Sequence, residues 1–394
     1  MKDVLTEVVE DLQPSNDDKR ETVLNTLREH IDDATIQLGG SVSKNTHVGD
    51  DYDIDIFIKY PLTDDDDISD ALEKQLQRIG WTYKRIQASR DYFVISEGSH
   101  DYELVPVRDI TKPAEAETVI DISPLHIDYF NEQATSELRD QVRLLKQFMK
   151  SEYIYGAESY INGFSGHVVD LLTIAYGSFH DVLTASQEWS PKTIIDIEEH
   201  HDTPMLTLNE SKTSGPLIVV DPIQSDRNAA AAVDISSYNR FISAAERFTT
   251  TPSAGQFDKP DLEDRITLFE ERMSDSCVTV HIEVGFDDDQ RHDLSGAQLV
   301  KIKEHCVRHL DKESFHVFDS FIHHERTSDI IIGCTPEPTS DQKVLAGPPL
   351  DKETHVQRFR DAHSQTETRQ GRVFAHEPHT YDDLLTALNA VLDD

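Results

Sequence analysis

The chain has 394 residues, and 37 Lys and Arg residues against 75 Asp and Glu residues give a formal net charge of −38 at pH 7. This length predicts two to four domains, and neither a signal-peptide core nor an apolar run near the roughly 20 residues that cross a bilayer is found, so we expect no membrane association. Three widely spaced cysteines offer no disulfide framework, which favours a reduced, cytoplasmic protein.

The N-terminal third is predicted to be a small mixed unit of helices and strands. Residues 52–60 alternate with period two, which predicts a strand with Asp53, Asp55 and Phe57 on one face and three isoleucines on the other. A short strand precedes it and runs into a glycine turn. The remaining pattern predicts helices over 16–32 and about 67–79, and strands over 81–86, 91–96 and 101–107.

The central third is predicted to be helical over 134–186, 189–200 and 228–249. Beyond a polar, turn-rich linker at 249–263, a strand–helix–strand–strand pattern predicts a ferredoxin-like domain. We therefore expect a multidomain α+β protein with a mixed head domain (1–133), a helical central domain (134–249), an α+β domain (250–375) and a short helical tail (376–394).

The strongest chemical pattern is LGGSVSKNTHVGDDYDIDIF, residues 38–57. Its Gly40–Ser41 turn would let backbone N–H groups and a hydroxyl approach a phosphate. Asp53 and Asp55 share one strand face, where carboxylates repel unless a cation lies between them, and hard oxygen ligands favour Mg²⁺. An isolated Asp-x-Asp pair is usually solvated surface. With Glu103 on a later strand, however, the combination fits two-metal phosphoryl transfer.

This pattern resembles the signature of the DNA polymerase beta-type nucleotidyltransferases. The later segments DISPLHIDYF, QVRLLKQFMK, YIYGAESYINGFSGHVVDLL, AYGSF and VVDPIQSDRNAAAAVD resemble, in order, the archaeal (class I) CCA-adding enzymes, which are tRNA nucleotidyltransferases. The resemblance is dense over 38–250 and weaker to about 375. It implies a polymerase beta-like head and template-independent addition of the 3′-terminal CCA to tRNA from CTP and ATP, with release of pyrophosphate.

The resemblance also implies roles for residues at matching positions. Asp53, Asp55 and Glu103 would hold two Mg²⁺ ions, and Arg227 would read the nucleobase edge, a task that suits a planar fork of donors. The nucleotide-binding positions are Gly40, Ser41, Lys44, His126, Lys146, Tyr155 and Arg227. Considered without the family, His126 would equally suit a structural cap, Lys146 the wet edge of a helix, Tyr155 packing, and Arg227 an ion pair with Asp226.

The chain departs from the family pattern at four places. Glu103 stands where Asp is usual, Lys44 stands where Arg is usual, and SRDYFV replaces a segment E-H-P-Y-V. The helical tail is also shorter than in relatives, where it grips the far side of the tRNA acceptor arm. These differences change the expected binding of tRNA more than the expected chemistry of nucleotidyl transfer.

The acidic charge is spread along the whole chain and resembles the surface of proteins that work in concentrated salt, where the Debye length falls to ~3 Å at 1 M. It therefore does not exclude a polyanionic partner. We expect Arg358, Arg360, Arg369 and Arg372 to contact the tRNA acceptor stem. The family also implies a homodimer. Two alternatives stay open: a poly(A)-type or other RNA nucleotidyltransferase, and a catalytically weakened tRNA-binding protein.

Overall fold

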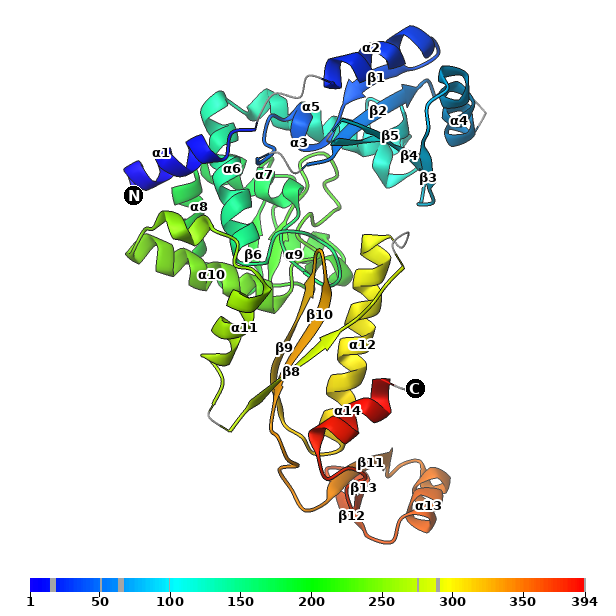
Figure 1. Ribbon diagram of the computed structural model, residues 1–394, viewed down its shortest axis with the longest axis vertical. Helices are drawn as coiled ribbons and strands as arrows, with labels where there is room; N and C mark the ends of the chain where they lie inside the picture. The colour runs from blue at the N-terminus through cyan, green and yellow to red at the C-terminus, as the bar shows by residue number, and fades with distance from the viewer. Residues whose placement is uncertain are drawn as a thin grey trace. The chain divides into compact units, whose positions relative to one another are not determined.

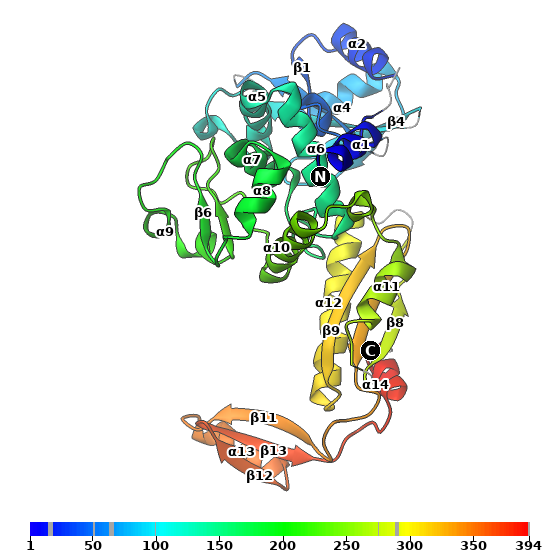
Figure 2. The same cartoon turned by 90° about the vertical axis from the view of Figure 1, so that its left-hand side faces the viewer.

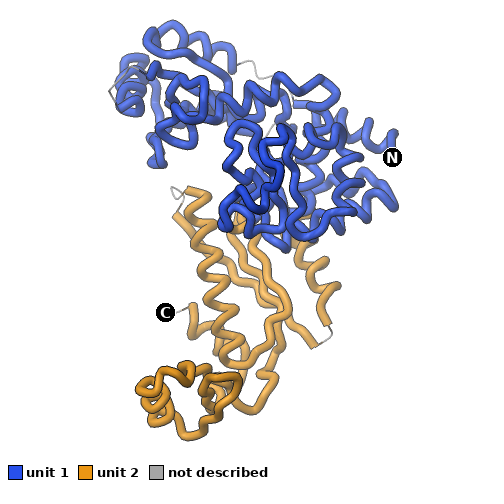
Figure 3. The backbone as a smooth tube through the Cα atoms, turned by 180° about the vertical axis from the view of Figure 1, so that it is seen from behind, with its two compact units in different colours: residues 1–157, 161–259 blue, residues 158–160, 260–394 orange. Residues whose placement is uncertain are grey.

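A computed structural model describes residues 1–14, 19–49, 52–62, 67–98, 100–274, 276–287 and 291–392. The chain forms two compact units, which Figure 3 draws in different colours. Unit 1 holds residues 1–157 and 161–259, and unit 2 holds residues 158–160 and 260–394. The change of unit lies inside the predicted linker. Unit 1 includes the predicted head domain and, apart from residues 158–160, the predicted central domain, and the division between these two stays a prediction.

Unit 1 contains a five-stranded sheet, and α2 and α4 cover one of its faces (Figure 1). Its elements are α2 (Arg20–His30), β1 (Thr35–Leu38), α3 (Gly40–Ser43), β2 (Ile54–Tyr60), α4 (Ile68–Ile79), β3 (Lys84–Ile86), β4 (Tyr92–Glu97) and β5 (His100–Arg108). The strand order is β1-β2-β5-β4-β3, in which β2 and β5 are parallel and the other neighbours are antiparallel.

The two faces of β2 separate the core from the candidate site, as the alternating pattern predicts. Ile54, Ile56 and Ile58 are fully buried against apolar residues of α2 and α4. Asp55 and Phe57 lie on the opposite face, where Phe57 packs with residues of β5 and of the helix that follows the sheet.

The rest of unit 1 is mostly helical, and most of it shares one apolar core, while Leu208, Ile218 and Val220 form a small separate cluster. Its helices are α1 (Lys2–Asp11), α5 (Ser123–Gln133), α6 (Ser136–Ser151), α7 (Gly166–Tyr176), α8 (Phe179–Ser186), α9 (Pro204–Thr207) and α10 (Ile235–Thr250), with short 3₁₀ helices at Pro113–Glu115, Val119–Ile122, Glu210–Thr213 and Ala254–Phe257.

Two predicted helices in this part need correction. The helix expected over 189–200 is wrong, because the β-branched run Thr193–Ile195 forms strand β6, which pairs in parallel with β7 (Leu217–Val219). The helix expected from residue 228 begins only at Ile235, where the Asp234 side chain caps it by accepting a hydrogen bond from the Ser237 N–H.

Unit 2 is built on a three-stranded antiparallel sheet with helices on both faces (Figure 2). Its elements are α11 (Leu262–Glu270), β8 (Val278–Glu283), α12 (His292–Lys312), β9 (Val317–His324), β10 (Ser328–Cys334) and α14 (Leu384–Leu392). The strand order is β8-β10-β9. Apolar residues of α12 and α14 share one core with this sheet, and Phe269 of α11 packs on the other face, 5.2 Å from Phe321. The predicted strand–helix–strand–strand order is confirmed.

A second, smaller sheet of unit 2 has the order β11-β13-β12 and is antiparallel throughout. It consists of β11 (Lys343–Pro349), β12 (Thr366–Arg369) and β13 (Arg372–Glu377), and α13 (Glu353–Ala362) packs against β11. This part carries the four arginines that the sequence suggests for RNA binding.

Candidate active site

The predicted acidic residues lie on two neighbouring parallel strands. Asp55 on β2 and Glu103 on β5 are direct partners in the strand register, so their side chains leave the same face of the sheet next to each other. Asp53 is exposed and stands two residues before Asp55, just ahead of β2. The strands thus present two of the acids side by side, with the third at the end of the same row.

Burial and mutual repulsion raise the pKa values of two of these carboxyl groups. The pKa of Asp55 is raised to about 6, first by burial and then by the charge of Asp53, while Lys44 acts in the opposite direction. The pKa of Glu103 is raised to about 7 by burial and then by Asp55 and Asp53. A divalent cation would relieve this repulsion, and carboxylate oxygens are the ligands that Mg²⁺ prefers.

A double-glycine bend brings the chain against Asp55. The Gly39 N–H donates a hydrogen bond of 2.7 Å to the main-chain oxygen of Asp55. Gly40 has a φ of +52°, and a Cβ atom built on it would lie 1.8 Å from Oδ2 of Asp55. Only glycine therefore fits at this position without moving the carboxylate. The half-buried Ser41 follows in the single turn of α3.

A pocket of about 420 Å³ opens over this face of the sheet. It brings together five of the predicted site residues, which are Gly40, Lys44, Asp55, Glu103 and His126. The other lining residues are Phe57, Ala88, Ser89, Arg90, Tyr92, Val105, Ile120, Ser123, Ile127 and His167. Five predicted site residues do not line this pocket, namely Ser41, Asp53, Lys146, Tyr155 and Arg227.

The two predicted lysines are held by buried partners. Nζ of Lys44 lies 2.7 Å from Oδ2 of Asp170, and both side chains are almost fully buried. Nζ of Lys146 donates to the Thr46 hydroxyl at 2.9 Å, and burial lowers the pKa of Lys146 to about 8. Oδ1 of Asp170 is buried and has no hydrogen-bond partner among the residues that the structure describes. Asp170 is not among the residues predicted from the sequence, although it is the one charged residue in the apolar helix α7.

A buried carboxylate joins His126 to Arg227. Oδ1 of Asp221 accepts from Nε2 of His126 at 3.0 Å, and Oδ2 accepts from Nε2 of His167 at 3.1 Å and from Nη1 of Arg227 at 2.9 Å. Arg227 thus pairs with Asp221, whereas Asp226 pairs with Lys212. His167 and Asp221 are not among the residues predicted from the sequence, although they lie inside the segments GFSGHVVDLL and VVDPIQ.

Within the described residues, His126, His167 and Asp221 are the one group of three metal-binding side chains whose ligand atoms all lie within 4.8 Å of one another. The carboxylate oxygens of Asp53, Asp55 and Glu103 do not all lie within this distance, so they are farther apart than the ligand atoms of the cluster.

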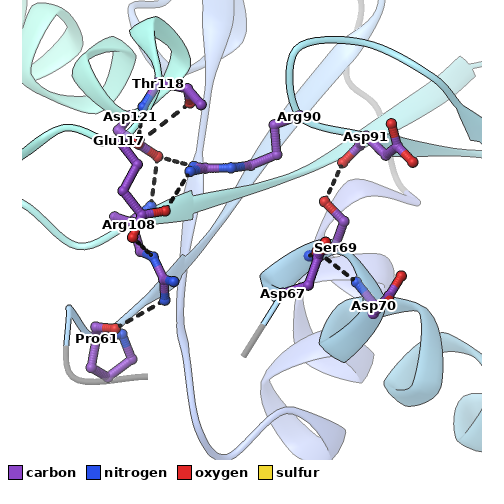
Figure 4. Close-up of polar contacts among 10 residues, drawn as sticks. All are labelled: Pro61, Asp67, Ser69, Asp70, Arg90, Asp91, Arg108, Glu117, Thr118 and Asp121. Carbon is purple, nitrogen blue, oxygen red and sulfur yellow. Dashed lines mark hydrogen bonds and ion pairs between the residues drawn. The ribbon is translucent and has the colours of Figure 1, made fainter. Parts of the chain in front are cut away.

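Ion pairs at the pocket rim fix the segment that leads into α5 (Figure 4). Arg90, which stands in the SRDYFV segment, pairs with the fully buried Asp121 and lies 3.0 Å from Glu117. Asp121 also accepts from the main-chain N–H groups of Arg108 and Thr118, at 2.8 and 2.9 Å. This network holds the wall from which α5 carries His126 toward the pocket.

The remaining predicted residues lie elsewhere in the two units. Tyr155 is half-buried against the helical core, and a Cβ atom built on Gly166 would lie 2.9 Å from its hydroxyl. In unit 2, the exposed Arg369 and Arg372 are register partners across the β12–β13 hairpin. Nη2 of Arg360, on α13, donates to the Thr368 hydroxyl at 3.2 Å. Arg358, on the same helix, is also exposed.

Two family models match most of the chain. The model for the second domain of tRNA nucleotidyltransferase matches residues 140–258, and the model for the C-terminal domain of CCA-adding enzyme matches residues 278–392. The CCA-adding enzyme of Thermococcus gammatolerans is 30% identical over 393 residues, which cover 93% of this chain and 84% of the relative. That of Nanoarchaeum equitans is 29% identical over 350 residues, covering 88% and 83%.

Solved structures show a likeness of fold. A cytoplasmic RNA terminal U-transferase and the Cid1 poly(U) polymerase each give a TM-score of 0.51 at 15% sequence identity. Each match covers 66% of this chain, and 100% and 98% of the respective neighbour. The polymerase beta-like fold predicted from the sequence is confirmed.

Proposed function

Since this chain belongs to the family of archaeal CCA-adding enzymes, we propose that it builds or repairs the 3′-terminal CCA of tRNA from CTP and ATP. In this reaction the terminal ribose oxygen forms a bond to the α-phosphorus, and the bond to pyrophosphate breaks. The observation that supports this assignment most is the pairing of Asp55 with Glu103 on parallel strands, in a pocket that also contains Gly40 and Lys44.

The proposed site gives each residue one task. Asp53, Asp55 and Glu103 would hold two Mg²⁺ ions, which would favour loss of the hydroxyl proton and stabilise the charge on the leaving oxygens. The raised pKa values of Asp55 and Glu103 fit such a site, because crowded carboxylates without a cation repel each other. In this proposal, the bound ions draw the carboxylate oxygens of Asp53, Asp55 and Glu103 close together.

The nucleotide would be held by residues around the carboxylates. Gly40, Ser41 and Lys44 would bind the triphosphate, with Lys146 and Tyr155 as further contacts. His126 and Arg227 would contact the nucleoside, held in place by their shared partner Asp221. Since phosphoryl transfer leaves little covalent work to the protein, these residues act by positioning and by electrostatics.

An end-addition assay tests the proposal. Transcripts of tRNA that lack one, two or three terminal nucleotides are incubated with CTP, ATP or both, over a salt series up to molar KCl. We expect two C residues to be added only with CTP, and one A residue only after CC. Asp53→Ala serves as the inactive control. Repeated addition of A to every transcript would indicate a poly(A)-type enzyme, and tRNA binding without incorporation would indicate a binding protein.

We propose that the arginines of unit 2 contact the acceptor stem of tRNA. Reversing two of them, Arg358→Glu with Arg360→Glu, is expected to raise the KM for tRNA about tenfold, because each lost phosphate contact weakens binding, and to leave kcat unchanged. The matched control is Lys301→Glu with Lys312→Glu, which changes the charge equally on exposed positions of α12. An equal effect of both pairs would contradict a specific contact.

This proposal includes a cytoplasmic location, which the cysteine pattern favours, and a homodimer, which the family resemblance implies. Across the described residues, no helix is both long and apolar enough to cross a bilayer.

A further inference from the structure

A second histidine lines the candidate pocket together with His126. His167, on α7, contributes to the pocket wall, and its ring centroid lies 4.3 Å from that of His126. We propose that Nδ1 of His167 accepts a hydrogen bond from a ribose hydroxyl of the incoming nucleotide, so that the site selects ribonucleotides. This inference rests on the proposed function and adds a residue that determines sugar specificity.

The hydrogen bonds around Asp221 define which nitrogen of His167 is available. Burial by itself would raise the pKa of Asp221, but hydrogen bonds from His126 and His167 hold this pKa well below its usual range. The ionised carboxylate can only accept, so Nε2 of each histidine must donate to it. In a neutral imidazole the other nitrogen is then an acceptor, and burial lowers the pKa of His167, which favours this neutral form.

Nδ1 of His167 is free to meet a ligand. In the part of the chain that the structure describes, this atom has no hydrogen-bond partner, and the side chain is 18% exposed. An acceptor at a pocket wall suits a hydroxyl donor rather than a phosphate oxygen, which itself only accepts. The chemistry of the atom therefore favours the sugar over the triphosphate.

The order of residues in the site matches the order of groups in a nucleotide. Lys44, proposed for the triphosphate, lines the same pocket as His167. Asp221 in turn connects His167 to Arg227, which is proposed to read the base. In a nucleoside triphosphate the ribose lies between these two groups. His167 thus stands at the level of the ribose, and Asp221 acts as a positioning residue.

The same cluster is less suited to a metal ion. The two oxygens of Asp221 accept five hydrogen bonds, from both histidines, from Arg227 and from the main-chain N–H groups of Ile223 and Gln224. The Arg227 guanidinium already balances the carboxylate charge, so a cation bound here would face a fixed positive group. These contacts favour a hydrogen-bonded clamp, by which we mean Asp221 together with His126, His167 and Arg227.

Two substitutions of His167 separate its two nitrogens. In His167→Gln the terminal amide can still donate to Asp221 in place of Nε2, but the Nδ1 acceptor is lost. In His167→Asn the amide oxygen stands near the former Nδ1, but the bond to Asp221 is lost. Calorimetry with MgCl₂ and without tRNA would measure the Kd of each protein for CTP, 2′-deoxyCTP and 3′-deoxyCTP.

We expect the wild type to bind CTP about tenfold more tightly than the analogue that lacks the recognised hydroxyl, the size of one buried hydrogen bond. The ratio should fall to about twofold or less in His167→Gln and be retained better in His167→Asn. The two analogues identify whether the 2′ or the 3′ hydroxyl is read. Each ratio compares ligands on one preparation, so partial unfolding of a variant cancels.

Equal affinity of the wild type for all three nucleotides would overturn the inference, as would a ratio that His167→Gln leaves unchanged. Equal weakening of all three ligands would instead indicate a purely structural histidine and would also overturn it. Because this measurement needs no RNA, it is independent of the end-addition assay: a protein that discriminates between sugars but adds nothing to tRNA would contradict the proposed function alone.

Discussion

Replacing Asp55 with Asn is expected to stabilise the metal-free protein at pH 8 while it abolishes nucleotide addition. The pKa of Asp55 is raised to about 6 in the folded chain, so the native state binds more protons than the unfolded state between pH 4 and 6. Stability therefore falls as the pH rises through this window, and the loss is complete above it. Asn removes the buried charge and should recover about 1–2 kcal/mol at pH 8.

Thermal unfolding in EDTA at pH 8 and pH 5 measures this effect. The variant should melt about 2–8 °C higher at pH 8, and the difference should shrink at pH 5, where Asp55 is mostly protonated in the wild type. Adding Mg²⁺ should raise the melting temperature of the wild type more than that of the variant. Nucleotide addition should fall by about a hundredfold or more, as when one electrostatic stabiliser of a transition state is removed.

The two outcomes together distinguish a metal ligand from an ordinary buried acid. A structural carboxylate would lose stability on substitution, because its hydrogen-bonding partners would be left unsatisfied. A variant that is both less stable in EDTA and as responsive to Mg²⁺ as the wild type would contradict the proposed role of Asp55. The matched control is Asp101→Asn, which removes an exposed acid from the same strand as Glu103.

The carboxylates Asp53, Asp55 and Glu103 could be predicted from the sequence because the alternation that indicates a strand is a local pattern. Alternation over residues 52–60 places Asp55 opposite the buried isoleucines, and the register of β2 with β5 then brings Glu103 beside it. The same locality explains the wrong prediction over 189–200, where helical spacing favoured a helix, although Thr193–Ile195 pairs with β7, which begins 22 residues after Ile195. Such pairing depends on distant residues, which a local pattern does not contain.

The clamp around Asp221 could not be predicted for the same reason. Its partners come from α5, from α7 and from the loop after β7, so their meeting depends on how the helices pack. Lys146 illustrates a related limit. Its position on an amphipathic helix does not reveal that Thr46, a hundred residues earlier, holds its ammonium group.

Replacing Gly40 with Ala is expected to reduce nucleotide addition by about a hundredfold or more. An added Cβ would stand 1.8 Å from Oδ2 of Asp55, far inside van der Waals contact, so that the carboxylate or the bend must move. The φ of +52° adds strain of roughly 1 kcal/mol for a residue with a side chain. A displacement of about 1 Å at the reacting groups is enough for a loss of this size.

Gly49→Ala separates backbone strain from the steric contact with Asp55. Gly49 has a φ of +61°, but a Cβ atom there would meet nothing within 4 Å. Both variants should lose similar stability from backbone strain in thermal unfolding, and Gly40→Ala alone should also lose activity and the stabilisation by Mg²⁺. If both variants lost activity equally, strain in the loop would explain the effect. If neither did, the bend at Gly40 would have no part in placing Asp55, and the close approach of the glycine turn to the carboxylates would serve folding rather than catalysis.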